Sequence, residues 1–322
     1  MGQIMLKLLG FVILGLVFSI AQSADNYPSH PVRIITPAVP GGTTDYLARL
    51  VATRLTESWK QQAIVDNRGS ASGVNGAEIT KNSAPDGYTL FIAYHQHTIN
   101  AAILPKLPYH PVNDFTPISQ LTAAGTLLLV NHNHPAKNLK EFVDWSHSTK
   151  DPINFGSAGI GSGGHLAGEL YKLMAGIQGQ HIPYKGTGPA IVDLIAGQYQ
   201  FSFAGLTPAM IQVRSGKLRA IAVTAGKRVS SLPDIPAMAE VLPGFEVVGW
   251  YGLIGPAGLP KPIVQKINAE LVAFTKSEDF IKKVHADGAE AVSNDPETFR
   301  RYMLADLKKW SDLVKKSGTK FN

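Results

Sequence analysis

The sequence predicts an α/β fold divided into two lobes, and three observations support this. Segments rich in β-branched residues alternate with segments of helical periodicity along the chain. The length of 322 residues lies beyond the point at which one hydrophobic core usually stops growing. Two glycine-rich turns, 39–45 and 156–165, each follow a strand-like segment and precede an amphipathic helix. Because they lie far apart in the chain, we expect one turn in each lobe.

The first part of the chain predicts three strands and a helix. The strand at 32–36 is rich in isoleucine and valine, and the helix at 44–59 has apolar residues at helical spacing. Short apolar runs predict strands at 63–65 and 89–93, the second after the turn Pro85-Asp86-Gly87. Strands separated by helices pair in a parallel, doubly wound sheet.

A second alternation follows the segment 114–120. The same patterns predict strands at 126–130, 153–155, 201–204, 218–223 and 247–254, and helices at 139–146, 165–174 and 188–196. Further helices begin near Pro262 and Pro296, since proline is tolerated in a first helical turn. We expect the chain to cross between lobes near residues 124 and 247. This gives domain 1 as 25–124 plus 248–322, and domain 2 as 125–247.

The N-terminus predicts a cleaved secretory signal over residues 1–23. Lys7 precedes an apolar run from Leu8 to Ile20, which is short for a membrane span. The small residues Ala21 and Ser23 predict cleavage after Ser23. An uncleaved anchor helix is the alternative. We therefore expect the mature protein in the periplasm.

The composition indicates an ordinary globular protein. Apolar residues make up 44% and charged residues 17% of the sequence, which excludes disorder and a polytopic membrane protein. The net charge is +6, but the lysine and arginine residues are scattered along the chain and do not indicate nucleic-acid binding. The chain has no cysteine, so neither disulfides nor a lipid-bearing cysteine are expected.

The two glycine-rich turns predict two halves of one anion site. Backbone N–H groups converge where a strand ends and a helix begins, with the positive end of the helix dipole behind them. Gly41 and Gly42 permit close backbone approach, and Thr43 and Thr44 add hydroxyl donors. A tight structural turn is the alternative, and Asp45 is interpreted as a helix-start residue. The second turn supplies the candidates Ser157, Ala158, Gly161 and Ser162.

Nucleotide and catalytic interpretations of these turns are weaker. The glycines lack the spacing G-x-G-x-x-G, no P-loop lysine follows, and the serines are not framed as G-x-S-x-G. A secreted serine hydrolase that uses Ser162, His165 and Asp193 remains an alternative in composition. We expect no enzymatic activity and no cofactor.

Other candidates lie at strand and helix ends that we expect to face the cleft between the two lobes. The segment Tyr94-His95-Gln96-His97-Thr98 follows a strand at the sheet edge where ligands bind in open α/β folds, and it is expected as a loop. His95, Gln96, His97 and Thr98 are therefore assigned to the far end of the ligand. Metal binding by His95 and His97, or by His132 and His134, is the weaker alternative. In the second lobe the candidates are Tyr184, Gly186, Phe203, Ala204 and Gly205.

The ordered motifs resemble the Bug family, the periplasmic solute receptors of tripartite tricarboxylate transporters, over essentially the whole mature chain. The motifs are Pro40-Gly41-Gly42-Thr43-Thr44-Asp45, Gly76-Ala77-Glu78, Gly156-Ser157-Ala158-Gly159, Gly161-Ser162 with His165-Leu166, and the segments 27–33, 65–68, 84–90, 183–186, 189–190, 193–198, 216–220, 232–236 and 250–253.

The resemblance implies a type II-like Venus flytrap whose two domains, each a doubly wound sheet flanked by helices, close on a carboxylate. It places the ligand on backbone N–H and serine hydroxyl groups of the second turn, often through water. It also implies an integral membrane permease as partner, and we expect a monomer. Relatives that capture amino acids tend to carry an acid near Ala204, so a dicarboxylate is expected here, including an aromatic one such as terephthalate. A sensor subunit that delivers its ligand signal to a membrane partner is the alternative.

Overall fold

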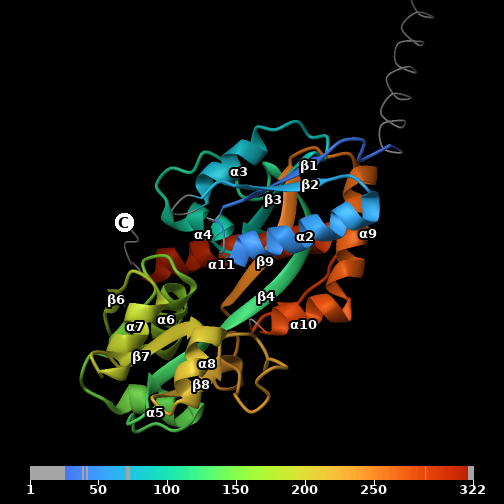
Figure 1. The fold of residues 1–322 in the computed structure, drawn as a ribbon. Coiled ribbons are helices and arrows are strands. Elements are labelled where there is room, and N and C mark those ends of the chain that lie inside the picture. The colour runs from blue at the N-terminus through green and yellow to red at the C-terminus, as the bar shows by residue number, and fades with distance from the viewer. Residues whose placement is uncertain (1–25, 38–39, 41–42, 70–72, 287, 318–322) are drawn as a thin grey trace, which may run out of the picture.

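The computed structural model describes residues 26–317 apart from 38–39, 41–42, 70–72 and 287, and it forms two α/β lobes joined by crossing strands (Figure 1). The predicted signal segment and the candidates Gly41 and Gly42 lie outside the described residues. Within the described residues, no helix has the length and apolar character needed to span a membrane.

Lobe 1 is built on one end of a mixed sheet. Its strands lie in the order β2 (Ala63–Asn67), β1 (Val32–Thr36), β3 (Thr89–Tyr94), β9 (Val248–Pro256) and β4 (Phe115–Asn131), with the short β10 (Glu290–Ala291) also paired to β4. Its helices are α2 (Thr43–Trp59), α3 (Val74–Lys81), α4 (Gln96–Ile103), α9 (Lys261–Thr275) and α10 (Glu278–Ala286).

Lobe 2 is built on the other end of the same sheet. Its strands lie in the order β6 (His181–Pro183), β5 (Phe155–Ser157), β7 (Phe201–Gly205) and β4, with β8 (Leu218–Val223) also paired to β4. Its helices are α5 (Leu139–Ser148), α6 (Gly163–Ala175), α7 (Thr187–Ile195), α8 (Leu206–Arg214) and the 3-10 turn Met238–Glu240.

The strand β4 runs through both lobes without a break (Figure 1). Its residues 115–125 pair with β9, and its residues 126–131 pair with β7 and β8. The expected parallel pairing is present for β1 with β2 and β3, and for β5 with β6 and β7. The crossing strands β4 and β9 pair antiparallel, because one carries the chain into lobe 2 and the other carries it back.

The C-terminal helix α11 (Pro296–Ser317) packs against both lobes. Phe299 and Met303 belong to an apolar cluster of lobe 1 with Phe91 and Trp250. Farther along the helix, Trp310 joins the main cluster of lobe 2. Helix α4 also reaches this lobe 2 cluster, through Ile99 and Ile103. The lobes are therefore joined by helix packing as well as by the crossing strands.

Candidate functional site

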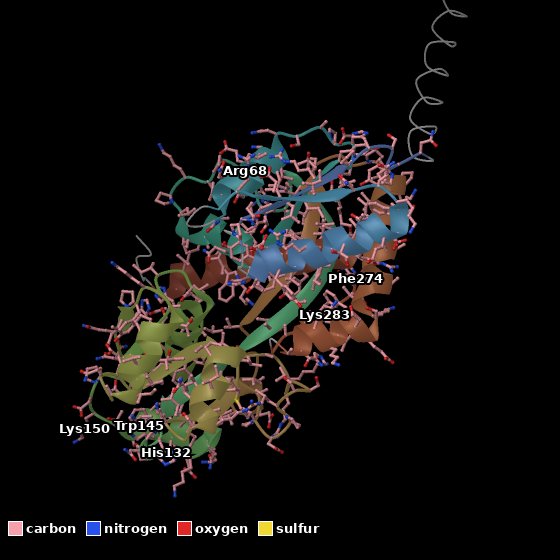
Figure 2. The ribbon with its side chains drawn as sticks, in the orientation of Figure 1. Arg68, His132, Trp145, Lys150, Phe274 and Lys283 are labelled. Carbon is pink, nitrogen blue, oxygen red and sulfur yellow. The ribbon has the colours of Figure 1, made fainter. Side chains whose placement is uncertain are left out.

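A cleft of about 770 Å³ lies beside the crossing strands, and both lobes contribute to it. Thr43, Tyr46 and Leu47 of α2 line one side, and the start of α8 lines the other. The remaining lining comes from the crossing strands and from the region of α10: Thr122, Ala124, Gly125, Tyr251, Lys283, Val284, Ala286, Gly288 and Ala289. Lys283 projects from α10 (Figure 2), and its ammonium lies 2.7 Å from the Asp279 carboxylate. Most of the wall is thus apolar, with hydroxyl groups at the end formed by α2.

The start of α2 brings two of the predicted candidates to this cleft or just beneath it. Thr43 is exposed at the cleft and forms a side-chain hydrogen bond with Tyr251, whereas Thr44 is buried. The Asp45 carboxylate accepts hydrogen bonds from Arg49 at 3.0 Å and from Asn67 at 2.9 Å. Its negative charge is therefore compensated within lobe 1.

In the second glycine-rich turn, the serine hydroxyl groups bond within the turn. The Ser162 hydroxyl donates to the Ser157 oxygen at 3.2 Å and accepts from the His165 N–H at 3.3 Å, as the N-cap of α6. The Ser157 oxygen also accepts from the Gly159 N–H at 3.1 Å and is fully buried. The first N–H groups of any helix lack acceptors within the helix. The donors that α6 offers a ligand are accordingly the N–H groups of its first turn.

The second turn faces α4 of lobe 1. A Cβ atom on Gly161, whose φ is +74°, would lie 2.9 Å from Ile103 and 3.7 Å from the Gln96 amide nitrogen. Gln96 in turn donates to Asn100 at 3.0 Å. Gly161 thus provides the close approach of the two lobes at this point, and it places the candidate Gln96 next to the turn.

Lobe 2 supports the turn from behind. The Ala158 carbonyl accepts from the Gly186 N–H at 3.0 Å. The Tyr184 N–H donates to the Ser157 carbonyl at 3.0 Å, and the Tyr184 hydroxyl donates to Asp193 at 2.7 Å. Tyr184 and Gly186 therefore hold the turn in place through backbone hydrogen bonds.

The end of β7 connects the second turn with the cleft. The first turn of α6 lies against it, since a Cβ on Gly164 would come within 2.3 Å of the Phe203 carbonyl oxygen. The Phe203 ring stacks on Phe245 at 6.2 Å within the apolar core, and Ala204 is also buried. Of the three candidates on this strand, Gly205 is the one that lines the cleft.

His95 lies against the crossing strand β9. Its N–H donates to the Trp250 carbonyl at 3.0 Å, and its Nδ1 lies 3.3 Å from the position of a Cβ on Gly249. Within the described part of the chain this Nδ1 is buried without a hydrogen-bond partner. Burial lowers the pKa of His95 to about 4, although the Asp306 carboxylate opposes this shift. The imidazole is therefore neutral at neutral pH.

His97 and Thr98 point away from the cleft, in contrast to the expected ligand contact. His97 is 2% exposed, stacks on Tyr109 at 5.2 Å, and its Nε2 lies 2.9 Å from the Pro111 carbonyl. The Thr98 hydroxyl donates to Asp306 of α11 at 2.7 Å. The segment forms the start of helix α4 instead of the expected loop, and the helical turn directs these two side chains into the core.

The residues of the hydrolase alternative bond to different partners. Ser162 bonds within its turn, the His165 Nδ1 accepts from the Gly161 N–H at 3.0 Å, and Asp193 accepts from Tyr184. The hydrogen bonds described for these side chains in this part of the structure thus lead to three different partners, whereas a triad joins a nucleophile, a base and an orienting acid in one chain of bonds.

The second histidine pair, His132 and His134, lies at one end of lobe 2 and has structural contacts there. Figure 2 shows His132 and Trp145 there, away from the crossing strands. The His134 ring packs on Trp145 at 4.3 Å, its Nδ1 accepts from the Ala136 N–H at 3.1 Å, and the His132 carbonyl accepts from Arg219 at 2.9 Å. Across the residues that the structure describes, no group of three or more histidine, cysteine, aspartate or glutamate side chains is arranged to hold a metal ion.

Several residues that line the cleft carry no signal in the sequence pattern. Tyr251 belongs to the family-like segment 250–253, but that pattern does not indicate that its side chain lines the cleft beside Thr43. Tyr46, Leu206 and Lys283 also line the cleft. Their helical periodicity indicates only which residues share a helix face, and the partner of that face is set by the other lobe.

Comparisons with known proteins agree with this architecture. The family model of the tripartite tricarboxylate transporter family receptor matches residues 47–319. Protein BugT of Bordetella pertussis is 31% identical over 319 residues, which covers 98% of each chain.

Solved structures give the same result. An R. palustris protein solved with adipate is 32% identical with a TM-score of 0.75, over 91% of this chain and 98% of that one. MatC from Rhodopseudomonas palustris with bound malate is 32% identical with a TM-score of 0.71, over 89% of this chain and 100% of that one. A TctC solute binding protein from Polaromonas is 25% identical with a TM-score of 0.82, over 90% of this chain and 99% of that one.

Proposed function

This chain belongs to the tripartite tricarboxylate transporter receptor family of periplasmic solute-binding proteins, and from that premise we propose that it captures a small dicarboxylate and delivers it to a membrane permease. The observation that carries the proposal is the pair of helix starts at the junction of the lobes. Helix α2 begins at Thr43 on the cleft, and α6 begins at Gly163 beside the turn that faces α4. Both helix starts direct N–H groups and positive dipole ends toward an anion.

Two features support a dicarboxylate as the ligand. Two relatives were solved with adipate and with malate, and each of these molecules carries two carboxylate groups. The cleft of about 770 Å³ is within the range of small-molecule sites, and its wall is mostly apolar. An aliphatic or aromatic body between two carboxylates, as in adipate or terephthalate, matches this wall.

We propose residues 25–124 plus 248–322 and residues 125–247 as the two units that close on the ligand. The change of pairing partners within β4, between Gly125 and Thr126, supports a hinge at this point. The mature chain, starting after Ser23, acts as a monomer, and the closed form is the one presented to the permease.

A thermal-shift screen tests the function. The mature protein is heated with mono-, di- and tricarboxylates, including adipate, malate and terephthalate. Ligand that binds only the native state stabilises it by about 2.7 kcal/mol at a concentration of 100 times Kd, so a dicarboxylate should raise Tm by several degrees. The absence of a shift with every dicarboxylate in the panel would contradict the proposal.

A second experiment tests the α6 site. A Cβ on Gly163 meets no atom within 4 Å, so the backbone position tolerates a side chain, and Gly163→Leu adds apolar bulk beside the helix start. We expect at least a tenfold loss of affinity for the panel dicarboxylate that gives the largest shift, measured by calorimetry, with Tm nearly unchanged. Gly188→Leu, also in open space near the start of a helix, is the matched control. Equal affinity in both variants would exclude the start of α6 from the site.

A further inference from the structure

Two histidines stack directly behind the second glycine-rich turn. His165 of α6 and His181 of β6 lie with ring centroids 3.7 Å apart and planes 11° apart. His165 is 1% exposed, and the Phe155 ring lies 5.0 Å from that of His181 and 6.2 Å from that of His165, between ring centroids. Neither ring lines the cleft described above.

Each ring contacts a different part of the turn. The His165 Nδ1 accepts from the Gly161 N–H at 3.0 Å, and the His181 Nε2 lies 2.6 Å from the Ser157 hydroxyl oxygen. The Ser157 hydroxyl group has two hydrogen-bonding partners for its proton, the Gly159 carbonyl at 3.0 Å and the His181 Nε2 at 2.6 Å. The stacked pair therefore holds both ends of the segment 157–161.

The hydrogen bond to His165 requires a neutral imidazole. A ring nitrogen that accepts a hydrogen bond carries no proton, so His165 bears its proton on Nε2. Burial lowers the pKa of His165 to about 3 and that of His181 to about 4. Lys172 lowers both pKa values, and His181 also lowers that of His165. The Glu169 carboxylate faces the His165 Nε2 at 3.9 Å and is paired with Lys172 at 3.0 Å.

We propose that the stacked pair His165 and His181 positions the turn 157–161 so that the N–H groups at the start of α6 point at the ligand carboxylate. If these two rings served packing alone, phenylalanine would fill the space without the cost of burying polar nitrogens. Both positions instead carry histidine, and each histidine brings a ring nitrogen within hydrogen-bonding distance of the turn. This inference rests on the proposed function, because it assigns a positioning role within the same site.

The first test separates the acceptor from the ring. His165→Phe keeps an aromatic ring against His181 and removes the acceptor, whereas His165→Asn keeps an acceptor near the position of Nδ1 that does not titrate. Calorimetry with adipate, malate and terephthalate at pH 7 should show about a tenfold loss of affinity in His165→Phe and less than about a threefold loss in His165→Asn. His181→Gln should likewise bind more tightly than His181→Phe.

His134→Phe is the matched control. Its Nδ1 also accepts a backbone N–H, from Ala136 at 3.1 Å, but lies at the far end of lobe 2. We expect its affinity to equal that of the native protein. If His165→Phe and His134→Phe both bind with native affinity, the positioning role is overturned.

A measurement without ligand makes the inference testable on its own. In protein labelled with ¹⁵N-glycine, the Gly161 amide resonance should move between pH 5 and 3 as the Nδ1 becomes protonated, while far-UV circular dichroism reports that the fold persists. The same resonance should not move in His165→Asn. If the Gly161 amide titrates but the protein binds no dicarboxylate, the proposed function is wrong, whereas the hydrogen bond between Gly161 and His165 is confirmed. An amide that does not respond to His165 protonation would overturn the inference even if binding is strong.

Discussion

At the residue scale, the serines of the second turn take part in hydrogen bonds within the protein. Both hydroxyl groups bond inside the turn, so the available donors there are backbone N–H groups. Backbone donors hold a carboxylate but carry little information about the rest of a molecule. Under the proposed function we expect selectivity to come from side chains along the cleft, among which Tyr46, Tyr251 and Lys283 are the largest polar groups.

Thr98 gives a residue-scale prediction. Its buried hydroxyl donates to Asp306 at 2.7 Å, and the same carboxylate accepts from the Trp250 indole at 2.9 Å. Thr98→Val should lower the free energy of unfolding by about 1.5–3 kcal/mol, the range for a hydrogen bond to a charged group, as measured by urea denaturation. Thr98→Ser retains the hydroxyl and should lose less stability. If Thr98→Val instead loses dicarboxylate affinity but keeps native stability, Thr98 contacts the ligand as the sequence predicts.

At the element scale, the short strand β10 connects the lobes. Glu290 of β10 accepts from the Ser230 N–H at 3.1 Å and from the Ser230 hydroxyl at 2.7 Å in lobe 2. Its other oxygen lies 3.1 Å from the His285 Nε2. Just before this strand, a Cβ on Gly288 would lie 2.6 Å from the Leu206 Cβ at the start of α8. The segment from Gly288 to Glu290 therefore contacts α8, α10 and the Ser230 loop of lobe 2.

Glu290 gives a prediction on pH dependence. Although burial raises its pKa, the hydrogen bonds from Ser230 and His285 outweigh this, and the net pKa is lowered. Its stabilisation is thus present above the ordinary glutamate pKa of about 4.3 and is lost as pH falls through the lower folded-state value. Native protein should have a higher Tm than Glu290→Gln at pH 7, and the difference should shrink below about pH 4.

The control for this experiment is Glu297→Gln. Glu297 is exposed on α11, and its carboxylate lies 3.8 Å from Arg301. Pairs of this kind contribute little to stability, so its Tm should equal that of the native protein at both pH values. A Tm difference for Glu290→Gln that does not change with pH would rule out the charge as its cause.

At the scale of the whole molecule, both lobes share one sheet and one C-terminal helix. The crossing is tied by Thr224, which is fully buried and lies beside β4 and the start of β9. Its hydroxyl accepts from the Thr126 N–H at 2.7 Å and donates to the Val247 carbonyl at 2.7 Å. The two crossing segments are thus held together on the side of lobe 2.

Thr224 gives the prediction at this scale. Thr224→Val removes a donor and an acceptor at a buried site, so it should lower the free energy of unfolding by about 1–3 kcal/mol and change the affinity for the bound dicarboxylate. Thr224→Ser keeps the hydroxyl and should preserve native affinity. Urea denaturation and calorimetry measure the two effects. Equal behaviour of the valine and serine variants would show that the hydroxyl does not tie the crossing.

Several elements were predictable because their signals are local. The strand at 32–36 and the helix beginning near residue 44 agree with β1 and α2 to within a residue. The sequence predicts a loop at 94–98, whereas Tyr94 ends β3 and α4 begins at Gln96. Packing of Ile99 against lobe 2 and the bond of Thr98 to α11 stabilise a helix that its composition does not favour. The pairing of β4 and β9 in one antiparallel crossing also depends on distant segments.

The sequence by itself determined the α/β fold class, the membership of a receptor family and the two turns at which helices begin. These features depend on periodicity, glycines and the order of motifs, all of which lie along the chain. Only the tertiary structure decided which side chains face the cleft. It turned His97 and Thr98 into the core, brought Tyr251 to Thr43, and placed His165 and His181 behind the second turn. The direction of a side chain depends on the packing of segments far apart in sequence, and local periodicity does not carry that information.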